Sequence, residues 1–494
     1  MFARIDIAAL GTNQRASYMA VVAATVLSTV ISITALYFWL AENPARSLDA
    51  SVPTSDGLLA DMEASKGPTD LSGVLVAYGG AAADLPGYWP WFRGADSSNI
   101  HTGGEPLAGA WAADGPEVLW SVKLGEGFAG PAVLNGCVYL LDYNEEDRAD
   151  ALRCFSLADG QELWRRSYPI MIKRNHGMSR TIPAVTEKYI ITMGPRCHVV
   201  CLDTETGDFR WGIDLKKDYG TVEPLWYTGQ CPIIIDGKYT VIAPAGPDVL
   251  MMAVDCDTGS PIWKTPNPHG WNMSHSSIMP MTLLGKKMFV YSALGGMTAV
   301  SAEGEDAGAI LWEQPWDAKV VAPSPVQIEE NRIFMTAGYG KGSMMLELSE
   351  EKGKYSVQVL FETTPEEGLA CEQQTPLYYK GLLYGIMPKD AGALKGQFVC
   401  YRPDGSLFWS SGQDNRFGLG PFLLADDKFF LLDDDGVLTV LDANKGAYTQ
   451  LSQMRVIEGH DAWGPMAVAG TRLLMRDMNN LVCIEIGARG AQNV

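Results

Sequence analysis

Pro183 to Trp211, PAVTEKYIITMGPRCHVVCLDTETGDFRW, decides the fold, because variants of this stretch recur along most of the chain. Tyr189 to Thr192 and Val199 to Leu202 are short runs rich in β-branched, aromatic and aliphatic residues, and turn residues such as Thr206-Gly207 separate such runs. Pro183 cannot donate to a sheet ladder, so it belongs at the mouth of the first strand. The stretch therefore predicts a meander of four short strands, which is too small to be stable without neighbours of its own kind.

Eight copies of this meander can be aligned on the proline that opens the first strand. The prolines are Pro131, Pro183, Pro232, Pro280, Pro325, Pro376, Pro421 and Pro465. A repeat of about 40–50 residues made of strands is typical of a β-propeller. A tryptophan in the fourth strand is the second recurring position, and we expect it to dock on the adjacent blade. The tryptophans at this position are Trp120, Trp164, Trp211, Trp263, Trp312 and Trp409.

The two ends of the array predict how the ring closes. The eighth copy, Pro465 to Ile486, contains three strands, whereas Glu117 to Val122 is a tryptophan strand with no three strands before it. We therefore expect Leu119 to Val122 to pair with the strand at Leu481 to Ile486, so that no sheet edge stays open. The predicted fold is all-β: an eight-bladed β-propeller with terminal-strand ring closure, preceded by one N-terminal transmembrane helix and a flexible linker.

Six segments follow from this division of the chain. They are a short cytoplasmic amino terminus (1–15), a transmembrane anchor (16–41), a flexible linker (42–88), a lead-in segment that packs on the propeller (89–116), the propeller (117–487) and a C-terminal tail (488–494).

The predicted anchor is the apolar run from Tyr18 to Leu40, which as a helix is long enough to cross a bilayer. Arg4 and Arg15 precede it, which favours a cytoplasmic amino terminus and a propeller on the periplasmic or extracytoplasmic side. A cleaved signal peptide is the alternative interpretation, but the apolar run is longer than a signal peptide requires and no A-x-A site follows it.

The charge of the chain argues against nucleic acid as a partner. The sequence has 38 basic and 58 acidic residues, a net charge of -20, whereas nucleic-acid binding needs a basic surface. The nine cysteines suggest neither a disulfide framework nor a metal site. Cys154, Cys201, Cys400 and Cys483 share one repeat position that Ala253 and Ala299 occupy in other copies, so we expect small buried residues there.

The repeat resembles a known family. The pattern around Cys201-Leu202-Asp203, Thr206-Gly207 and Trp211, together with the lead-in Trp89-Pro90-Trp91-Phe92-Arg93-Gly94, is similar to the PQQ-binding-like (pyrroloquinoline quinone) β-propeller repeat family. The resemblance covers roughly residues 88–487 and implies the propeller fold. It leaves the activity open, because these repeats occur in quinoprotein dehydrogenases and also in a non-enzymatic lipoprotein of the outer-membrane assembly machinery.

The candidate ligand site is the channel rim formed by the loops that precede the innermost strands. The rim residues that we single out are polar or aromatic: His176, Arg180, Trp226, Gln230, Trp271, Asn272, His275, Glu372, Gln373 and Trp463. They could hold a peptide, a sugar or a planar cofactor. The plainer alternative is that they only cap a solvated funnel.

Two functions compete for this rim. A quinoprotein dehydrogenase of similar fold holds PQQ on a tryptophan floor under a vicinal disulfide, with a carboxylate and an asparagine on Ca²⁺ and an aspartate as base. By that resemblance Trp271 or Trp463 would form the floor, Glu372 and Asn272 would bind calcium, and Asp461 would be the catalytic base. The chain has no vicinal cysteine pair and no C-x-x-C-H haem motif, so we predict no firm cofactor and no other metal site.

The function that we favour is a binding or scaffold module of the cell envelope. The predicted helix would hold it at the membrane, and protein partners or a small ligand would meet the channel rim or an exposed sheet edge.

Overall fold

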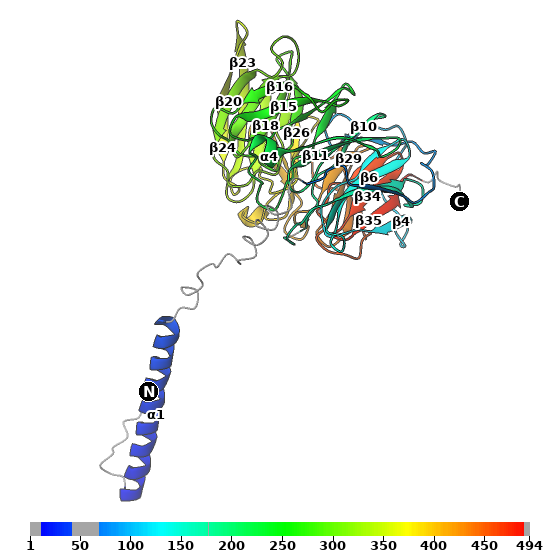
Figure 1. Cartoon of the computed structure of the whole chain (residues 1–494). Helices are drawn as coiled ribbons and strands as arrows, with labels where there is room; N and C mark the ends of the chain where they lie inside the picture. The colour runs from blue at the N-terminus through cyan, green and yellow to red at the C-terminus, as the bar shows by residue number, and fades with distance from the viewer. Residues whose placement is uncertain (1–10, 42–68, 176, 489–494) are drawn as a thin grey trace. The chain divides into compact units, whose positions relative to one another are not determined.

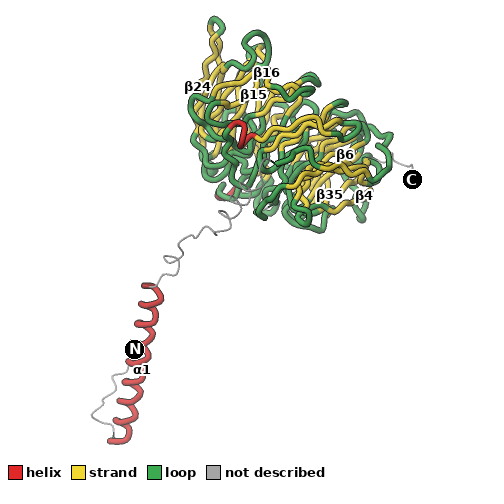
Figure 2. Tube along the Cα trace, viewed as in Figure 1, coloured by secondary structure: helices red, strands yellow, loops and turns green. Residues whose placement is uncertain are grey.

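The computed structural model describes residues 11–41, 69–175 and 177–488, and the chain forms two units that divide after Pro68. In the first unit the described residues form helix α1 (Thr12–Ala41). Figure 2 shows this helix in red, and its segment from Arg15 to Phe38 is long and apolar enough to cross a membrane. This confirms the predicted N-terminal apolar helix, with properties that a membrane anchor and a signal sequence share. Residues 1–10, 42–68 and 489–494 of the predicted terminus, linker and tail lie outside the described residues.

The second unit is the predicted propeller, with eight sheets that each correspond to one repeat (Figure 1). From the innermost strand outward, blades one to four are β5 (Ala132–Leu134), β6 (Cys137–Asn144), β7 (Ala149–Ser156), β8 (Glu162–Pro169); β9 (Ala184–Val185), β10 (Tyr189–Met193), β11 (His198–Asp203), β12 (Phe209–Asp214); β13 (Ile233–Ile235), β14 (Tyr239–Ile242), β15 (Val249–Asp255), β16 (Pro261–Pro266); and β17 (Met279–Leu283), β18 (Lys286–Ala293), β19 (Gly295–Ser301), β20 (Ile310–Trp316). Blades five to eight are β21 (Val326–Ile328), β22 (Arg332–Ala337), β23 (Gly342–Glu351), β24 (Lys354–Thr363); β25 (Leu377–Tyr379), β26 (Leu382–Ile386), β27 (Phe398–Tyr401), β28 (Leu407–Ser410); β29 (Phe422–Ala425), β30 (Lys428–Leu432), β31 (Val437–Asp442), β32 (Gln450–Arg455); and β33 (Ala467–Ala469), β34 (Arg472–Arg476), β35 (Asn480–Glu485), β4 (Val118–Lys123).

The ring closes as predicted. Strand β4, from the start of the repeat array, pairs antiparallel with β35, so that Val122 lies opposite Leu481 and Trp120 opposite Cys483. The last blade is thus built from strands at both ends of the repeat array, and this pairing closes the ring. Two short helical segments, α4 (Leu215–Tyr219) and η2 (Gly392–Leu394), lie in connections between strands.

The repeat positions have a common geometry inside each blade. The small residue of the third strand lies directly opposite the tryptophan of the fourth, as for Cys154 with Trp164, Ala253 with Trp263 and Cys400 with Trp409. In six blades the register of this strand pair shifts immediately after the small residue, which is the mark of a β-bulge. In blade five the shift follows Met345, and in blade seven it follows Val440. A small residue at this place leaves room for the indole, and all nine cysteines are buried and unpaired.

The fourth-strand tryptophans cover the turn of the following blade. A Cβ built on Gly160 of blade one would lie 2.7 Å from Trp120 of blade eight, and one on Gly259 of blade three would lie 2.8 Å from Trp211 of blade two. Trp120 and Trp211 also donate from Nε1 to carbonyls of the covered turn, Leu157 O at 3.0 Å and Cys256 O at 2.8 Å. In blade five Phe361 takes this place and lies over Gly405. Each of these three rings therefore rests on a residue without a side chain.

Part of the predicted linker belongs to the propeller instead. Strand β1 (Val74–Ala77) pairs antiparallel with β8 and extends the outer edge of blade one. The prediction that the flexible linker reaches residue 88 is therefore wrong for this segment, because the backbone of residues 74–77 is taken up by the ladder to β8. Four strand residues bounded by glycines and small residues carry too little periodicity to be recognised beforehand.

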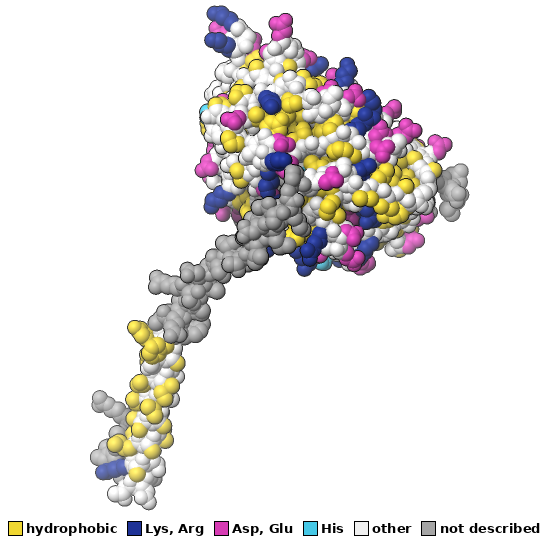
Figure 3. All heavy atoms as spheres, viewed as in Figure 1, with side chains coloured by type: hydrophobic (Ala, Val, Ile, Leu, Met, Phe, Trp, Pro, Cys, Tyr) yellow, Lys and Arg dark blue, Asp and Glu magenta, His cyan; other side chains and the backbone are white. Residues whose placement is uncertain are grey.

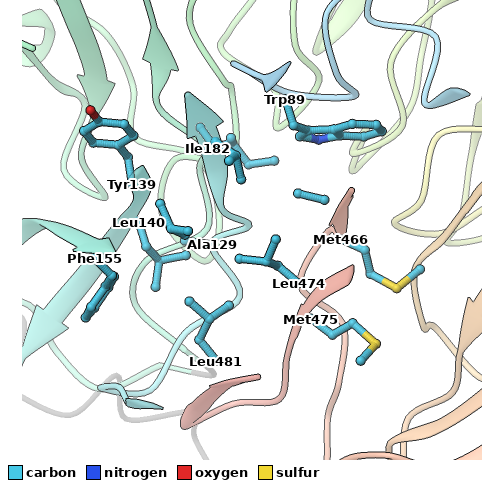
Figure 4. Packing of buried hydrophobic residues seen from close by; sticks show 14 of the residues in the cluster. Trp89, Ala129, Tyr139, Leu140, Phe155, Ile182, Met466, Leu474, Met475 and Leu481 are labelled. Carbon is cyan, nitrogen blue, oxygen red and sulfur yellow. The ribbon is translucent and has the colours of Figure 1, made fainter. Parts of the chain in front are cut away.

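The lead-in crosses the propeller at the innermost strands. Strand β2 (Tyr88–Trp89) adds to β5 of blade one, and Val185 N of blade two donates to Pro90 O at 2.8 Å. On the other side, β3 (Ile100–His101) adds parallel to β29 of blade seven. Trp89 is 1% exposed and shares one apolar cluster with Ile182 and Met466 (Figure 4). Residues 88–101, which we call the crossing segment, thus tie blades one and two to blade seven.

Candidate functional site

The wholly buried side chain of Arg93 holds the middle of the crossing segment. Its guanidinium donates to Thr375 O at 3.0 Å and Pro376 O at 3.1 Å, which belong to blade six, and to Ser97 O and Ser98 O of the crossing segment itself. Asn99 Nδ2 donates to Phe422 O of blade seven at 2.6 Å. Because these acceptors lie on or beside the innermost strands, the crossing segment forms a floor beneath the loops that precede those strands.

A cavity opens above this floor. It holds about 1020 Å³ of space, its open mouth included, and Phe92, Arg93 and Asn99 line it from the crossing segment. The loops before the innermost strands supply most of its wall. A cavity with aromatic walls and a few polar groups has the character of a binding site for a small molecule or a side chain.

Six of the predicted rim residues line this cavity: Arg180, Trp226, His275, Glu372, Gln373 and Trp463. They come from the loops that precede the first strands of blades two, three, four, six and eight. His176 lies outside the described residues.

Four predicted site residues lie elsewhere. Gln230 is fully buried, and its side chain bonds both backbone groups of Ala243 inside blade three. The indole of Trp271 packs against Gly295 and Gly296, and Asn272 is exposed in a backbone bridge with Leu294. Asp461 has a left-handed backbone and its Oδ2 lies 3.0 Å from His460 Nδ1. Loop conformation, which the repeat pattern does not constrain, directs these side chains away from the cavity.

Tyr339 is a lining residue that the sequence interpretation missed. It lies in the turn between β22 and β23 of blade five, with φ of 57°, whereas the predicted rim lies in the loops before the first strands. The signal that could have found it is an aromatic residue between Gly338 and Gly340, where backbone freedom lets a large side chain turn inward.

Aromatic rings form two groups in the cavity wall. Trp226 stacks on His275, with ring centroids 6.3 Å apart, and lies 5.8 Å from the ring of Tyr339. Phe128 and Trp463 form a second pair at 5.1 Å, and the Arg180 guanidinium lies over the Phe128 ring at 5.3 Å. Such faces suit planar or cationic groups.

Burial and neighbouring charges set the protonation states in the cavity. Burial lowers the pKa of Arg180 to about 10, so it stays cationic at neutral pH. Burial and then the Arg180 charge lower the pKa of His275 to about 4, so its ring is neutral. Burial and then the Glu372 carboxylate raise the pKa of Tyr339 to about 12, which keeps the phenol protonated. The cavity therefore combines two guanidinium groups, those of Arg93 and Arg180, with one carboxylate and neutral aromatic rings.

These residues do not fit a calcium–quinone centre. Trp463 and Glu372 line the cavity, but Asn272 and Asp461 do not, and Trp271 packs against Gly295 and Gly296 of its own blade. Within the described ranges no group of three or more His, Cys, Asp or Glu side chains is placed to hold a metal ion. Cys231 lines the cavity but has no cysteine beside it in the sequence to form a vicinal disulfide. The donors that the resemblance to quinoprotein dehydrogenases requires are thus not brought together.

Comparison with known proteins agrees with the fold. Residues 90–225, 148–250 and 247–385 match the family model described as outer membrane protein assembly factor BamB. No curated protein matches the sequence significantly. Among solved structures, BamB from Moraxella catarrhalis is 12% identical, with a TM-score of 0.50, covering 75% of this chain and 100% of that chain.

Quinoprotein dehydrogenases share the fold as well. The quinohemoprotein alcohol dehydrogenase from Comamonas testosteroni is 12% identical, with a TM-score of 0.57, covering 84% of this chain and 82% of its own. A europium-containing methanol dehydrogenase is 12% identical, with a TM-score of 0.56, covering 79% and 89%. At identities this low, the structural similarity shows only that this chain shares the propeller fold.

Proposed function

Because the chain belongs to the family of outer membrane protein assembly factor BamB, we propose that it is a membrane-anchored, extracytoplasmic binding module whose cavity receives part of a protein partner. Helix α1 would hold the propeller at the membrane, with the amino terminus on the cytoplasmic side.

One observation carries this proposal: the crossing segment and the loops before the innermost strands line one cavity, whose described walls carry recognition groups without a metal–quinone donor set. Such a cavity suits an inserted side chain or loop. Aromatic faces together with two guanidinium groups and one carboxylate can bind it by packing and hydrogen bonding. An oxidoreductase would need electron-transfer chemistry that these residues are not arranged to support.

Site-specific photocross-linking tests the proposal in the full-length protein in native membranes. A benzophenone amino acid at Gln373, in the cavity wall, should give a discrete adduct with a protein partner. The same group at the exposed Gln358, on the outermost strand of blade five, is the control and should not. Trp226→Ala should weaken the Gln373 adduct several-fold.

Equal adducts at both positions, or adducts at Gln358 alone, would contradict binding in the cavity and would favour an outer sheet edge. Addition of PQQ and Ca²⁺ should leave the purified protein without alcohol-dependent dye reduction. Turnover in that assay would contradict the proposal in favour of a dehydrogenase.

A further inference from the structure

Glu372 is a buried carboxylate of the cavity wall, and together with burial its charge and its hydrogen bond with Tyr339 raise the pKa of that phenol. Glu372 lies in the loop before β25, is 4% exposed and packs closely on Gly338, where a Cβ would come within 2.7 Å of its Cγ. Its Oε1 is 3.4 Å from Lys389 Nζ. Its Oε2 is buried and has no hydrogen-bond partner within the described part of the chain. A buried carboxylate oxygen without a donor is costly, so this atom is suited to a donor from outside.

The surroundings of Glu372 favour a cation as that donor. Lys389 Nζ already lies over the Tyr339 ring at 5.3 Å, although the lysine side chain is 63% exposed. The Trp226 ring adjoins Tyr339, and ring faces attract ammonium and guanidinium groups. Both rings line the same cavity as Glu372. A cation that enters here meets a carboxylate and two aromatic faces.

Two other cationic side chains line the same cavity, and each has backbone acceptors of its own. Arg93 donates to four backbone carbonyls. Arg180, whose charge acts on His275 and Tyr339, donates to Gly177 O at 3.2 Å and lies over the Phe128 ring. His275, which stacks on Trp226, is neutral because burial lowers its pKa to about 4. The net charge of -20 also draws basic rather than acidic partners to the protein.

We propose that the cavity binds a basic side chain of the protein partner, an arginine or a lysine, whose cationic group donates to Glu372 Oε2 and lies against Trp226 and Tyr339. This rests on the proposed function and names the chemical group that the partner inserts. Lys389 is the internal competitor: it occupies one carboxylate oxygen and one ring face from the solvent side, and the partner's cation must share or displace it.

Matched tripeptides test the proposal by calorimetric titration of the full-length protein in detergent. The probes are acetyl-Ala-Arg-Ala-amide and its citrulline analogue, which has nearly the same shape without the charge. The arginine peptide should bind at least about tenfold more tightly than the citrulline peptide, because a hydrogen bond to a buried charged group is among the stronger ones. Equal binding of the two peptides, or no binding of either, would overturn the proposal.

Two variants should change the affinity in opposite directions. Glu372→Gln keeps the shape and should weaken arginine-peptide binding about tenfold or more, whereas Lys389→Met removes the competitor and should strengthen it about threefold to tenfold. Glu347→Gln, which breaks a surface pair with Arg332 on the same blade as Tyr339, is the control and should leave binding unchanged.

A general loss of structure would weaken peptide binding in every variant. Tighter binding by Lys389→Met would therefore show that Glu372 binds the peptide and does not only support the fold. An affinity that falls in Lys389→Met, or stays unchanged in Glu372→Gln, would contradict the proposal. Adducts at Gln373 without any discrimination between the peptides would refute the basic side chain and leave the binding function standing. Absence of both the Gln373 adduct and the peptide discrimination would refute the binding function and the basic side chain together.

Discussion

Gly259→Ala should destabilise the propeller more than an equivalent change at Gly285, because only Gly259 lies beneath a tryptophan. Both glycines have a left-handed backbone, with φ of 71° and 78°. A Cβ at Gly259 would lie 2.8 Å from Trp211 Cγ and 2.9 Å from Cδ2, whereas one at Gly285 would meet no atom within 4 Å. The pair therefore separates backbone strain from the steric cost of docking.

The expected magnitudes follow from these two costs. Left-handed backbone strain costs an alanine about 1–2 kcal/mol at either position. Overpacking against the ring adds about 1–3 kcal/mol at Gly259 alone, because Trp211 is fixed by its bond to Cys256 O at 2.8 Å. Gly259→Ala should thus reduce the free energy of unfolding by about 2–5 kcal/mol, and Gly285→Ala by about 1–2 kcal/mol.

Urea unfolding of the full-length protein in detergent, followed by tryptophan fluorescence, measures the difference. In a Trp211→Ala background the ring is gone, so the additional effect of Gly259→Ala should shrink to that of Gly285→Ala. Equal effects of the two glycine changes in the wild-type background would refute the reasoning that the tryptophan repeat docks one blade on the next.

Three further changes test the buried polar groups and the closure of the ring. Burial raises the pKa of Asp150 from 3.8 to about 7, so the folded state keeps a proton that the unfolded state has lost, and the free energy of unfolding should fall by up to about 4 kcal/mol as the pH rises from about 4 to about 7. Asp150→Asn removes this loss, so its stability relative to wild type should rise over that range. Urea midpoints measured at several pH values check this. Trp120→Ala should lower the free energy of unfolding by about 3–5 kcal/mol, because it removes the ring over Gly160 and the hydrogen bond to Leu157 O. Trp409→Ala should cost less, because Trp409 is half-buried and its Nε1 has no hydrogen-bond partner among the described residues. Thermal midpoints of the two variants test this order. Arg93→Met leaves the carbonyls of Thr375 and Pro376 without their donor and should lower the free energy of unfolding by about 2–4 kcal/mol. Amide hydrogen exchange should become faster first in the crossing segment. Equally faster exchange in all blades would contradict the conclusion that Arg93 holds this segment in place.

The repeat made the architecture predictable from the sequence. Strand-opening prolines and fourth-strand tryptophans mark positions that every blade needs, so eight copies and a leftover strand at Glu117 to Val122 were enough to predict the blade count and the closure by β4 and β35. The conformation of the repeats is fixed by local turns and by side-chain alternation, both of which are visible in the sequence.

The cavity was predictable only in part, because its residues lie where the repeat stops. Loops before the innermost strands were the correct place to look for Arg180, Trp226 and Glu372. Whether a loop residue points inward depends on backbone conformation, and this separates His275, which lines the cavity, from Asn272, which is exposed. The course of the crossing segment was hidden too, since β2 and β3 have two residues each and no periodicity of their own.

Closure by β4 also has a consequence for the order in which the protein can be made. During synthesis β4 emerges before any blade, while its partner β35 is the last strand of the array, and β3 likewise precedes the blade-seven strand β29 that it joins. Both must wait with unpaired edges until nearly the whole chain is available, which is the condition under which wrong pairing and aggregation compete with folding. Truncations that remove only blade eight should therefore leave earlier blades without a finished ring, and a nascent chain of this protein should depend on folding assistance until its final strand is released.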